Sequence, residues 1–196
     1  MPRTRVESDK AFISLGNTMH EKSVTMSPQN QRLTSKLIAF VAVMCAISNV
    51  LGFFTIPLGV AAIHLMQLPI ILTGLALGPA VGGLVGCIGA ATMAFRLSPP
   101  NPYILLGNAI LGFFTGLLYR RLRQMGGRPI IPQVVSVLGA LVIQFPYVYV
   151  TDVYLMPMPS AVVLGVILPK LLAEDLISVF LAHLILFRVN IAEILQ

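Results

Sequence analysis

Long stretches without charged residues dominate the sequence between Ser35 and Phe187. Six of these stretches approach the ~20 apolar residues that a helix needs to cross a bilayer core of about 30 Å. Of all residues, 57% are hydrophobic and only 10% are charged, and the mean hydropathy is +0.89. A water-soluble chain of 196 residues needs a larger polar surface than this composition supplies. The sequence therefore predicts a small polytopic membrane protein.

The apolar stretches are continuous rather than alternating, which favours transmembrane helices over a β-barrel. We predict an all-α membrane protein with six transmembrane helices and a turn at Pro57-Leu58-Gly59. Gly78-Pro79 separates the second helix from the third because proline lacks the amide hydrogen that a helix interior needs. Asn101-Pro102 is typical of a helix start. The predicted helices cover residues 35–54, 60–77, 79–95, 101–119, 130–154 and 161–187.

The positions of lysine and arginine predict the orientation in the membrane. Most of them fall before or at the start of the first helix, between the fourth and fifth helices, or after the sixth. Those nearest the helices are Arg32, Lys36, Arg120, Arg121, Arg123, Arg128 and Arg188. With six helices these groups share one side, which the positive-inside rule makes the cytoplasm. We therefore expect both termini in the cytoplasm. The pI near 9.8 then reflects orientation and contact with membrane lipid, and no nucleic-acid partner is predicted.

The chain is expected to have two parts. Residues 1–33 are polar and mixed in charge, which predicts a flexible cytoplasmic tail, and residues 34–196 form the transmembrane domain. Within that domain small residues recur at a spacing of four, at Gly74, Gly78, Gly82, Gly86 and Ala90, and again at Gly112 and Gly116. This spacing predicts close packing of the second, third and fourth helices.

Polar residues inside the predicted helices gather in the outer half of the last three. They are costly in lipid and usually face a cavity, a partner or the bundle interior. Their positions repeat every three, four or seven residues, so they share helix faces. The candidate substrate-binding residues are Arg96, Asn101, Asn108, Gln144, Tyr147, Thr151, Lys170 and Glu174, with Tyr154 continuing the face of the fifth helix. Each has a structural alternative: a bond between helices, an internal ion pair, or an interfacial aromatic belt. No catalytic or metal site is predicted.

Three segments carry a family resemblance. They are Ala42-Val43-Met44-Cys45-Ala46, then residues 68–79 (LPIILTGLALGP) continued by Gly82, Gly83 and Gly86, and residues 107–112 (GNAILG) running to Arg120-Arg121. Together with the length, helix number and orientation of residues 35–188, these segments resemble the substrate-binding S components of energy-coupling factor (ECF) vitamin transporters.

The resemblance implies a function, partners and a docking surface. It implies high-affinity capture of a small water-soluble vitamin or precursor by a multi-pass protein of the prokaryotic plasma membrane. The partners would be a transmembrane coupling subunit and two ATPase subunits, which hydrolyse the ATP. This chain would carry no cofactor, and it has no phosphate-binding glycine-rich loop. The strip Ala39, Ala42 and Ala46 would pack on the coupling subunit, although spacing alone fits the protein's own bundle equally well.

The identity of the substrate stays open at this stage, and so do two other functions. Lys170 and Arg96 suit an anionic vitamin, towards which we lean, whereas Glu174, Asp175 and Asp152 suit a cationic one. A membrane-embedded enzyme using Glu174, Asp175 and His183 is one alternative, but no adjacent nucleophile and base support it. A ligand-free channel or assembly subunit is the other. The clustering of polar residues in the outer half disfavours it.

Overall fold

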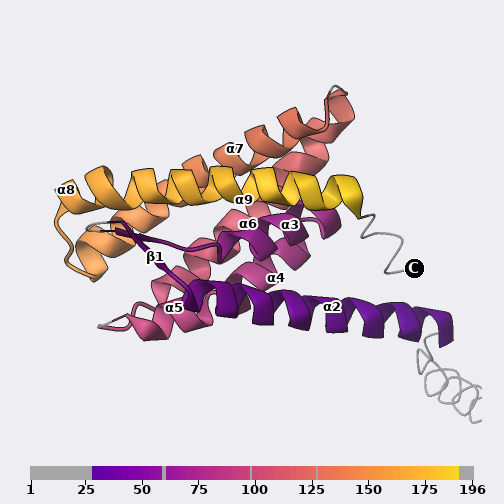
Figure 1. The fold of residues 1–196 in the computed structure, drawn as a ribbon, viewed down its shortest axis with the longest axis horizontal. Helices are drawn as coiled ribbons and strands as arrows, with labels where there is room; N and C mark the ends of the chain where they lie inside the picture. The colour runs from indigo at the N-terminus through magenta and orange to yellow at the C-terminus, as the bar shows by residue number, and fades with distance from the viewer. Residues whose placement is uncertain (1–27, 59–60, 98, 127, 190–196) are drawn as a thin grey trace, which may run out of the picture. The chain divides into compact units, whose positions relative to one another are not determined.

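The computed structural model describes residues 28–58, 61–97, 99–126 and 128–189 (Figure 1). The chain divides into two units, Met1–Lys36 and Leu37–Gln196, and the second holds the helical domain. Helix α2 runs from Pro28 to Phe53 and so begins before the predicted Ser35. Residues 28–33 of the predicted tail therefore belong to a helix. The rest of that tail lies outside the described residues.

The prediction of a six-helix membrane protein is confirmed. The helical segments after α2 are α3 (Gln67–Leu77), α4 (Pro79–Gly89) with α5 (Ala91–Arg96), α6 (Tyr103–Leu122) with η1 (Arg123–Met125), α7 (Ile130–Val150) with η2 (Thr151–Leu155), and α8 (Ser160–Val162) with η3 (Val163–Ile167) and α9 (Leu168–Arg188). Among the described residues, four helices are long and apolar enough to cross a membrane, namely Ser35–Phe53, Pro79–Arg96, Tyr103–Leu122 and Ile130–Leu155. Charged residues interrupt the apolar run of α9, and α3 is short.

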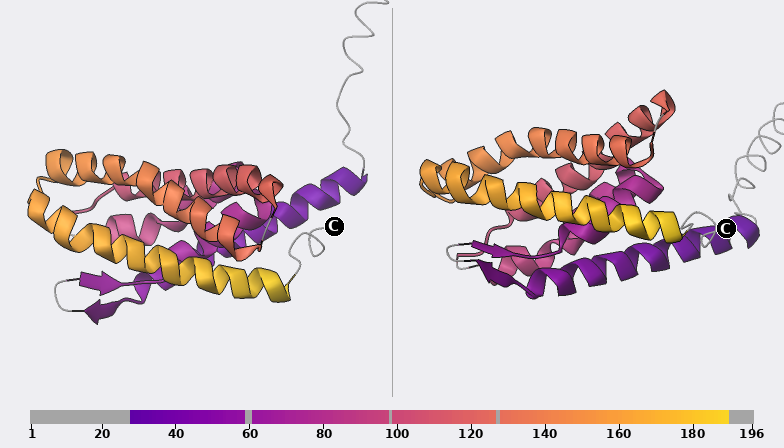
Figure 2. Two further views of the ribbon diagram at one scale, coloured as in Figure 1. Left: turned by 90° about the horizontal axis from the view of Figure 1, so that it is seen from above. Right: turned by 45° about the horizontal axis from the view of Figure 1, so that its top comes forward.

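The predicted second helix, residues 60–77, is wrong in its first third. Strands β1 (Ile56–Leu58) and β2 (Ala61–Ile63) form an antiparallel hairpin with Ile56 opposite Ile63, where a turn and a helix start were expected. Residues 54–63 are rich in β-branched side chains, which favour extended backbone. Within the predicted range 60–77 only α3 is helical. Its 11 residues span roughly 16 Å, about half the thickness of the bilayer core. Figure 2 shows the hairpin at the end of the domain where α7 and η2 give way to α8.

Glycines let α3, α4 and α6 approach one another, as their spacing predicts. A Cβ atom on Gly82 would lie 2.5 Å from the carbonyl oxygen of Gly112, and one on Gly74 would lie 2.8 Å from the same oxygen. A Cβ on Gly116 would lie 2.6 Å from the carbonyl carbon of Gly78. Real Cβ atoms do not tolerate such distances to backbone, so these helices pack main chain to main chain. Helix α6 also packs on α7, and α9 packs on both α3 and α7.

Helix α2 is fastened along one face to the break between α4 and α5. At that break the Asn49 side chain donates from Nδ2 to the Ile88 carbonyl (3.0 Å) and accepts at Oδ1 from the Thr92 amide (2.7 Å). Arg96 donates to the Phe53 carbonyl (2.6 Å) at the end of α2 and lies over the Phe53 ring. These bonds fix which side of α2 faces the bundle. The face of α2 with Cys45 and Ser48 is buried, whereas Ala42 and Ala46 are exposed.

Candidate substrate-binding site

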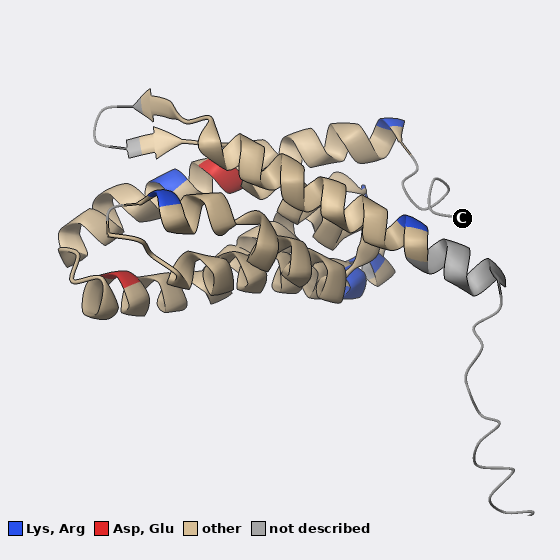
Figure 3. Cartoon of the chain, turned by 90° about the horizontal axis from the view of Figure 1, so that it is seen from below, with Lys and Arg blue, Asp and Glu red and all other residues tan. Residues whose placement is uncertain are grey.

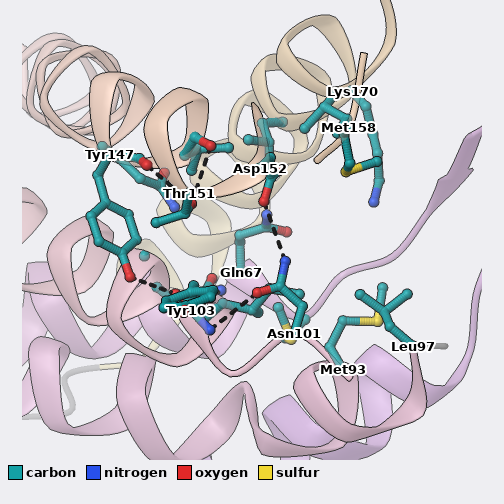
Figure 4. A pocket seen from close by; sticks show the side chains of 18 of the residues that line it. Gln67, Met93, Leu97, Asn101, Tyr103, Tyr147, Thr151, Asp152, Met158 and Lys170 are labelled. Carbon is teal, nitrogen blue, oxygen red and sulfur yellow. Dashed lines mark hydrogen bonds between the residues drawn. The ribbon is translucent and has the colours of Figure 1, made fainter. Parts of the chain in front are cut away.

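A cavity of about 380 Å³ lies between the β2–α3 segment and the facing ends of α5, α6, α7, η2, η3 and α9 (Figure 4). Its volume falls in the ~300–1,000 Å³ range of small-molecule sites. Most of the wall is apolar, with polar groups interspersed. Its lining residues are Ala62, His64, Met66, Gln67, Met93, Leu97, Asn101, Tyr103, Ile104, Gly107, Asn108, Gln144, Tyr147, Val148, Thr151, Asp152, Met158, Val162, Val166, Ile167, Lys170 and Leu171.

Three buried amide side chains converge on the cavity from three helices. They are Gln67 on α3, Asn108 on α6 and Gln144 on α7. The side-chain oxygen of each is buried and has no hydrogen-bond partner among the described residues. Leaving such an oxygen without a partner costs about 1–3 kcal/mol. Because all three residues line the cavity, these oxygens are candidate acceptors for a ligand that donates hydrogen bonds.

A second set of bonds holds the wall formed by α6, α7 and η2. Asn101 donates from Nδ2 to Asp152 Oδ1 (3.2 Å) and accepts at Oδ1 from the amide of Tyr103 (3.1 Å), the first residue of α6. The Tyr147 hydroxyl donates to the Tyr103 carbonyl (3.0 Å) and ties α7 to the same turn. Figure 4 shows this chain of contacts along the cavity. The Tyr103 and Tyr147 rings give the wall flat aromatic surface.

A buried ionic cluster forms the wall between the hairpin and α9. The Glu174 carboxylate accepts from the His64 backbone amide (2.8 Å) and from Gln67 Nε2 (3.2 Å), and Lys170 Nζ lies 3.6 Å from it. His64 lies in the loop between β2 and α3, outside the spanning helices. Burial, with the Lys170 charge adding to it, lowers the pKa of His64 to about 4. The neutral ring then accepts from Lys170 at Nε2 (3.5 Å).

Six of the eight predicted substrate-binding residues line this cavity, namely Asn101, Asn108, Gln144, Tyr147, Thr151 and Lys170. Glu174 is fully buried behind the wall and reaches the cavity only through the groups that it holds. Arg96 is engaged with the carbonyls at the end of α2 and does not line the cavity. The ion pair of Lys170 and the position of Arg96 remove the basis for our lean towards an anionic ligand.

Other lining residues were not among the predicted site residues. Gln67 was missed because we gave no role to this one polar side chain at the start of an apolar run, and its polarity was the available signal. Asp152 was considered only for a cationic ligand and was left out of the predicted site residues. It lies in η2, a π-helix marked by the Met156 amide bonding to the Thr151 carbonyl five residues back (2.9 Å). A π-turn contains an extra residue and rotates the helix faces of the residues after it. Tyr154, expected to continue the polar face of α7, is consequently 71% exposed.

Two further surfaces bear on function. Ala39, Ala42 and Ala46 are exposed on α2, among larger exposed apolar side chains such as Val43 and Val50. Arginines occupy the last turns of α6 and α9. Figure 3 shows basic residues at that end of the domain, while the acidic residues and further basic residues lie away from it. Among the described residues, no cluster of three or more His, Cys, Asp or Glu could hold a metal ion.

Comparisons with known proteins place this geometry in a family. A family model described as "ECF-type riboflavin transporter, S component" matches residues 32–191. A solved structure of the S component of a bacterial ECF transporter superposes with a TM-score of 0.60 and 18% sequence identity, over 86% of this chain and 99% of the other. At that identity the structure supports the fold alone. No curated protein matches in sequence.

Proposed function

Because the chain belongs to the ECF-type riboflavin transporter S component family, we propose that its cavity binds riboflavin and that this chain delivers it to the transporter. An S component is the substrate-binding subunit of an ECF transporter in the cell membrane and not an enzyme. Both alternatives, a membrane enzyme and a ligand-free subunit, are thereby set aside. The proposal concerns the specific vitamin, the contacts and the partner surfaces.

The observation that carries the riboflavin proposal is the set of three unpartnered amide oxygens in the wall of a mostly apolar cavity. Riboflavin has a flat ring system that carries an imide N–H, and a side chain of hydroxyl groups. The N–H and the hydroxyl groups can donate hydrogen bonds to the side-chain oxygens of Gln67, Asn108 and Gln144. The tyrosine rings supply flat surface for the ring system in a chain without tryptophan. Riboflavin is also uncharged, which fits a wall whose lysine is already paired.

A thermal-stability panel tests this proposal. The protein, purified in detergent, is heated with riboflavin, biotin, pantothenate or thiamine. A ligand that binds only the folded state stabilises it by about 2.7 kcal/mol at a hundred times its dissociation constant. We expect a dose-dependent rise with riboflavin and none with the charged vitamins. A rise with one of those and none with riboflavin would transfer the proposal to that compound.

We propose that the exposed alanine strip of α2 docks the coupling subunit, whose two ATPase partners hydrolyse the ATP. Small residues let two helix backbones approach closely in lipid. Helix α2 exposes Ala39, Ala42 and Ala46, whereas its buried face carries Cys45 and Ser48. The arginine-rich end of α6 and α9 would face the cytoplasm with both termini, which places the cavity towards the outside.

Bulky substitutions in this strip should separate assembly from ligand binding. We expect Ala42→Trp and Ala46→Trp to reduce co-purification of the coupling and ATPase subunits at least tenfold, because a large side chain blocks the close approach. Riboflavin affinity should not change, since neither residue lines the cavity. Val142→Trp is the matched control, as Val142 is 71% exposed on α7. Equal co-purification by all three variants would place the docking surface elsewhere.

A further inference from the structure

Glu174 occupies an unusual place in the cavity wall. Its side chain is fully buried, yet three groups that meet it line the cavity, namely His64, Gln67 and Lys170. All three approach the carboxyl as donors: a backbone amide, a side-chain amide and an ammonium group. An ionised carboxylate only accepts, so this surrounding suits the charged form. Glu174 touches no cavity space itself and acts through the groups that it holds.

The cavity wall that the described residues form has no uncompensated positive charge that would favour an anionic ligand. Lys170 is the basic group in the wall, its side chain is 19% exposed, and its Nζ lies 3.6 Å from Glu174 Oε1. Its other contact, His64 Nε2 at 3.5 Å, is a neutral acceptor. Asp152 adds a carboxyl to the wall at η2, where Asn101 donates to it. A ligand phosphate would therefore find no uncompensated positive charge in this wall.

From this arrangement we propose that Glu174 is a positioning residue that sets charge selectivity: by neutralising Lys170 from behind the wall, it makes the cavity prefer an uncharged flavin to its 5′-phosphate. The inference rests on the proposed riboflavin function and deepens it. According to this inference, Glu174 lies outside the cavity and yet causes the rejection of the 5′-phosphate, which differs from riboflavin only by an anionic group. Specificity of this kind is a difference between two affinities, achieved by withholding a favourable charge.

The test compares the dissociation constants of riboflavin and riboflavin 5′-phosphate for each variant. Glu174→Gln keeps the side-chain shape and leaves Lys170 uncompensated. We expect it to shift the ratio of the two constants towards the phosphate by roughly tenfold, the effect of one unit charge about 10 Å away at the effective dielectric of a protein. Loss of a purely structural role would weaken both ligands and leave the ratio unchanged.

The double variant Glu174→Gln with Lys170→Met isolates the charge. It removes both members of the pair, so the ratio should return close to the wild-type value. Glu174→Asp retains a carboxylate and should also keep that ratio. Thermal unfolding in detergent checks that each variant folds, and Glu174→Met removes the same charge if the amide is not tolerated. These variants separate a charge effect from a change of shape.

Two results would overturn the inference while leaving the riboflavin proposal intact. In the first, wild-type protein binds riboflavin, but Glu174→Gln leaves the ratio of the two dissociation constants unchanged. The other is a shifted ratio that the double variant does not restore, since the effect would then not pass through Lys170. Wild-type protein that is folded but binds no riboflavin would instead overturn the proposed function, and the inference with it.

Discussion

Gly112→Ala is expected to destabilise the protein strongly, because the added methyl group would meet the main chain of α4. A Cβ at Gly112 would lie 2.6 Å from the Gly82 carbonyl carbon and 2.9 Å from Ile70 Cγ2, and closer still to the Gly82 oxygen. Main chain cannot rotate away as a side chain can, so α4 and α6 must separate. Overpacking of this kind typically costs about 1–3 kcal/mol, and the backbone contact places this site at the upper end.

The control for this experiment is Gly165→Ala in η3, where nothing lies within 4 Å of the added methyl group. There the change should be neutral or slightly stabilising, because alanine is a better helix former than glycine by up to about 1 kcal/mol. Thermal unfolding in detergent compares the two variants. Equal stability would contradict the account of main-chain packing between α4 and α6.

Gln144→Leu is expected to lower riboflavin affinity at least tenfold without lowering stability. The Gln144 side chain is 3% exposed and its Oε1 has no partner in the part of the chain that the structure describes. In the unliganded protein, the substitution therefore breaks no hydrogen bond between this oxygen and the described residues. In the complex, the substitution removes an acceptor and leaves a buried donor of riboflavin without a partner. Such a loss weakens binding by about 1–3 kcal/mol.

Gln133→Leu provides the opposite pattern. Gln133 is equally buried on the same helix, and its Oε1 lies 2.8 Å from His183 Nδ1, outside the cavity lining. This substitution should lower stability by about 1–3 kcal/mol and leave riboflavin affinity unchanged. Titrations and unfolding curves for the two variants then form a crossed comparison. Loss of affinity in both, or in neither, would remove Gln144 from the binding site.

Sequence patterns predicted the membrane class and the helix packing because both depend on properties of single segments. Continuous apolar stretches are long enough to identify membrane helices on their own. The spacing of Gly74, Gly82 and Gly112 likewise predicted contacts that the structure contains. In each case one local pattern has few alternative explanations in lipid.

The parts that could not be predicted depend on contacts between distant segments. Residues 60–63 are apolar, and a short apolar run does not distinguish a strand from the start of a helix. The role of Arg96 was also hidden, because its bond to the Phe53 carbonyl joins residues 43 positions apart. The π-turn after Val150 changed which of Asp152 and Tyr154 faces the cavity. No periodicity rule anticipates such a shift.

Titration of riboflavin with the purified protein tests the central claim most directly, because the fluorescence of the flavin reports its transfer into a protein cavity. The account predicts saturable quenching with one riboflavin per chain, weakened by Gln144→Leu and unaffected by Gln133→Leu or excess thiamine. Folded wild-type protein that leaves the fluorescence of riboflavin unchanged, and binds none in equilibrium dialysis, would contradict it.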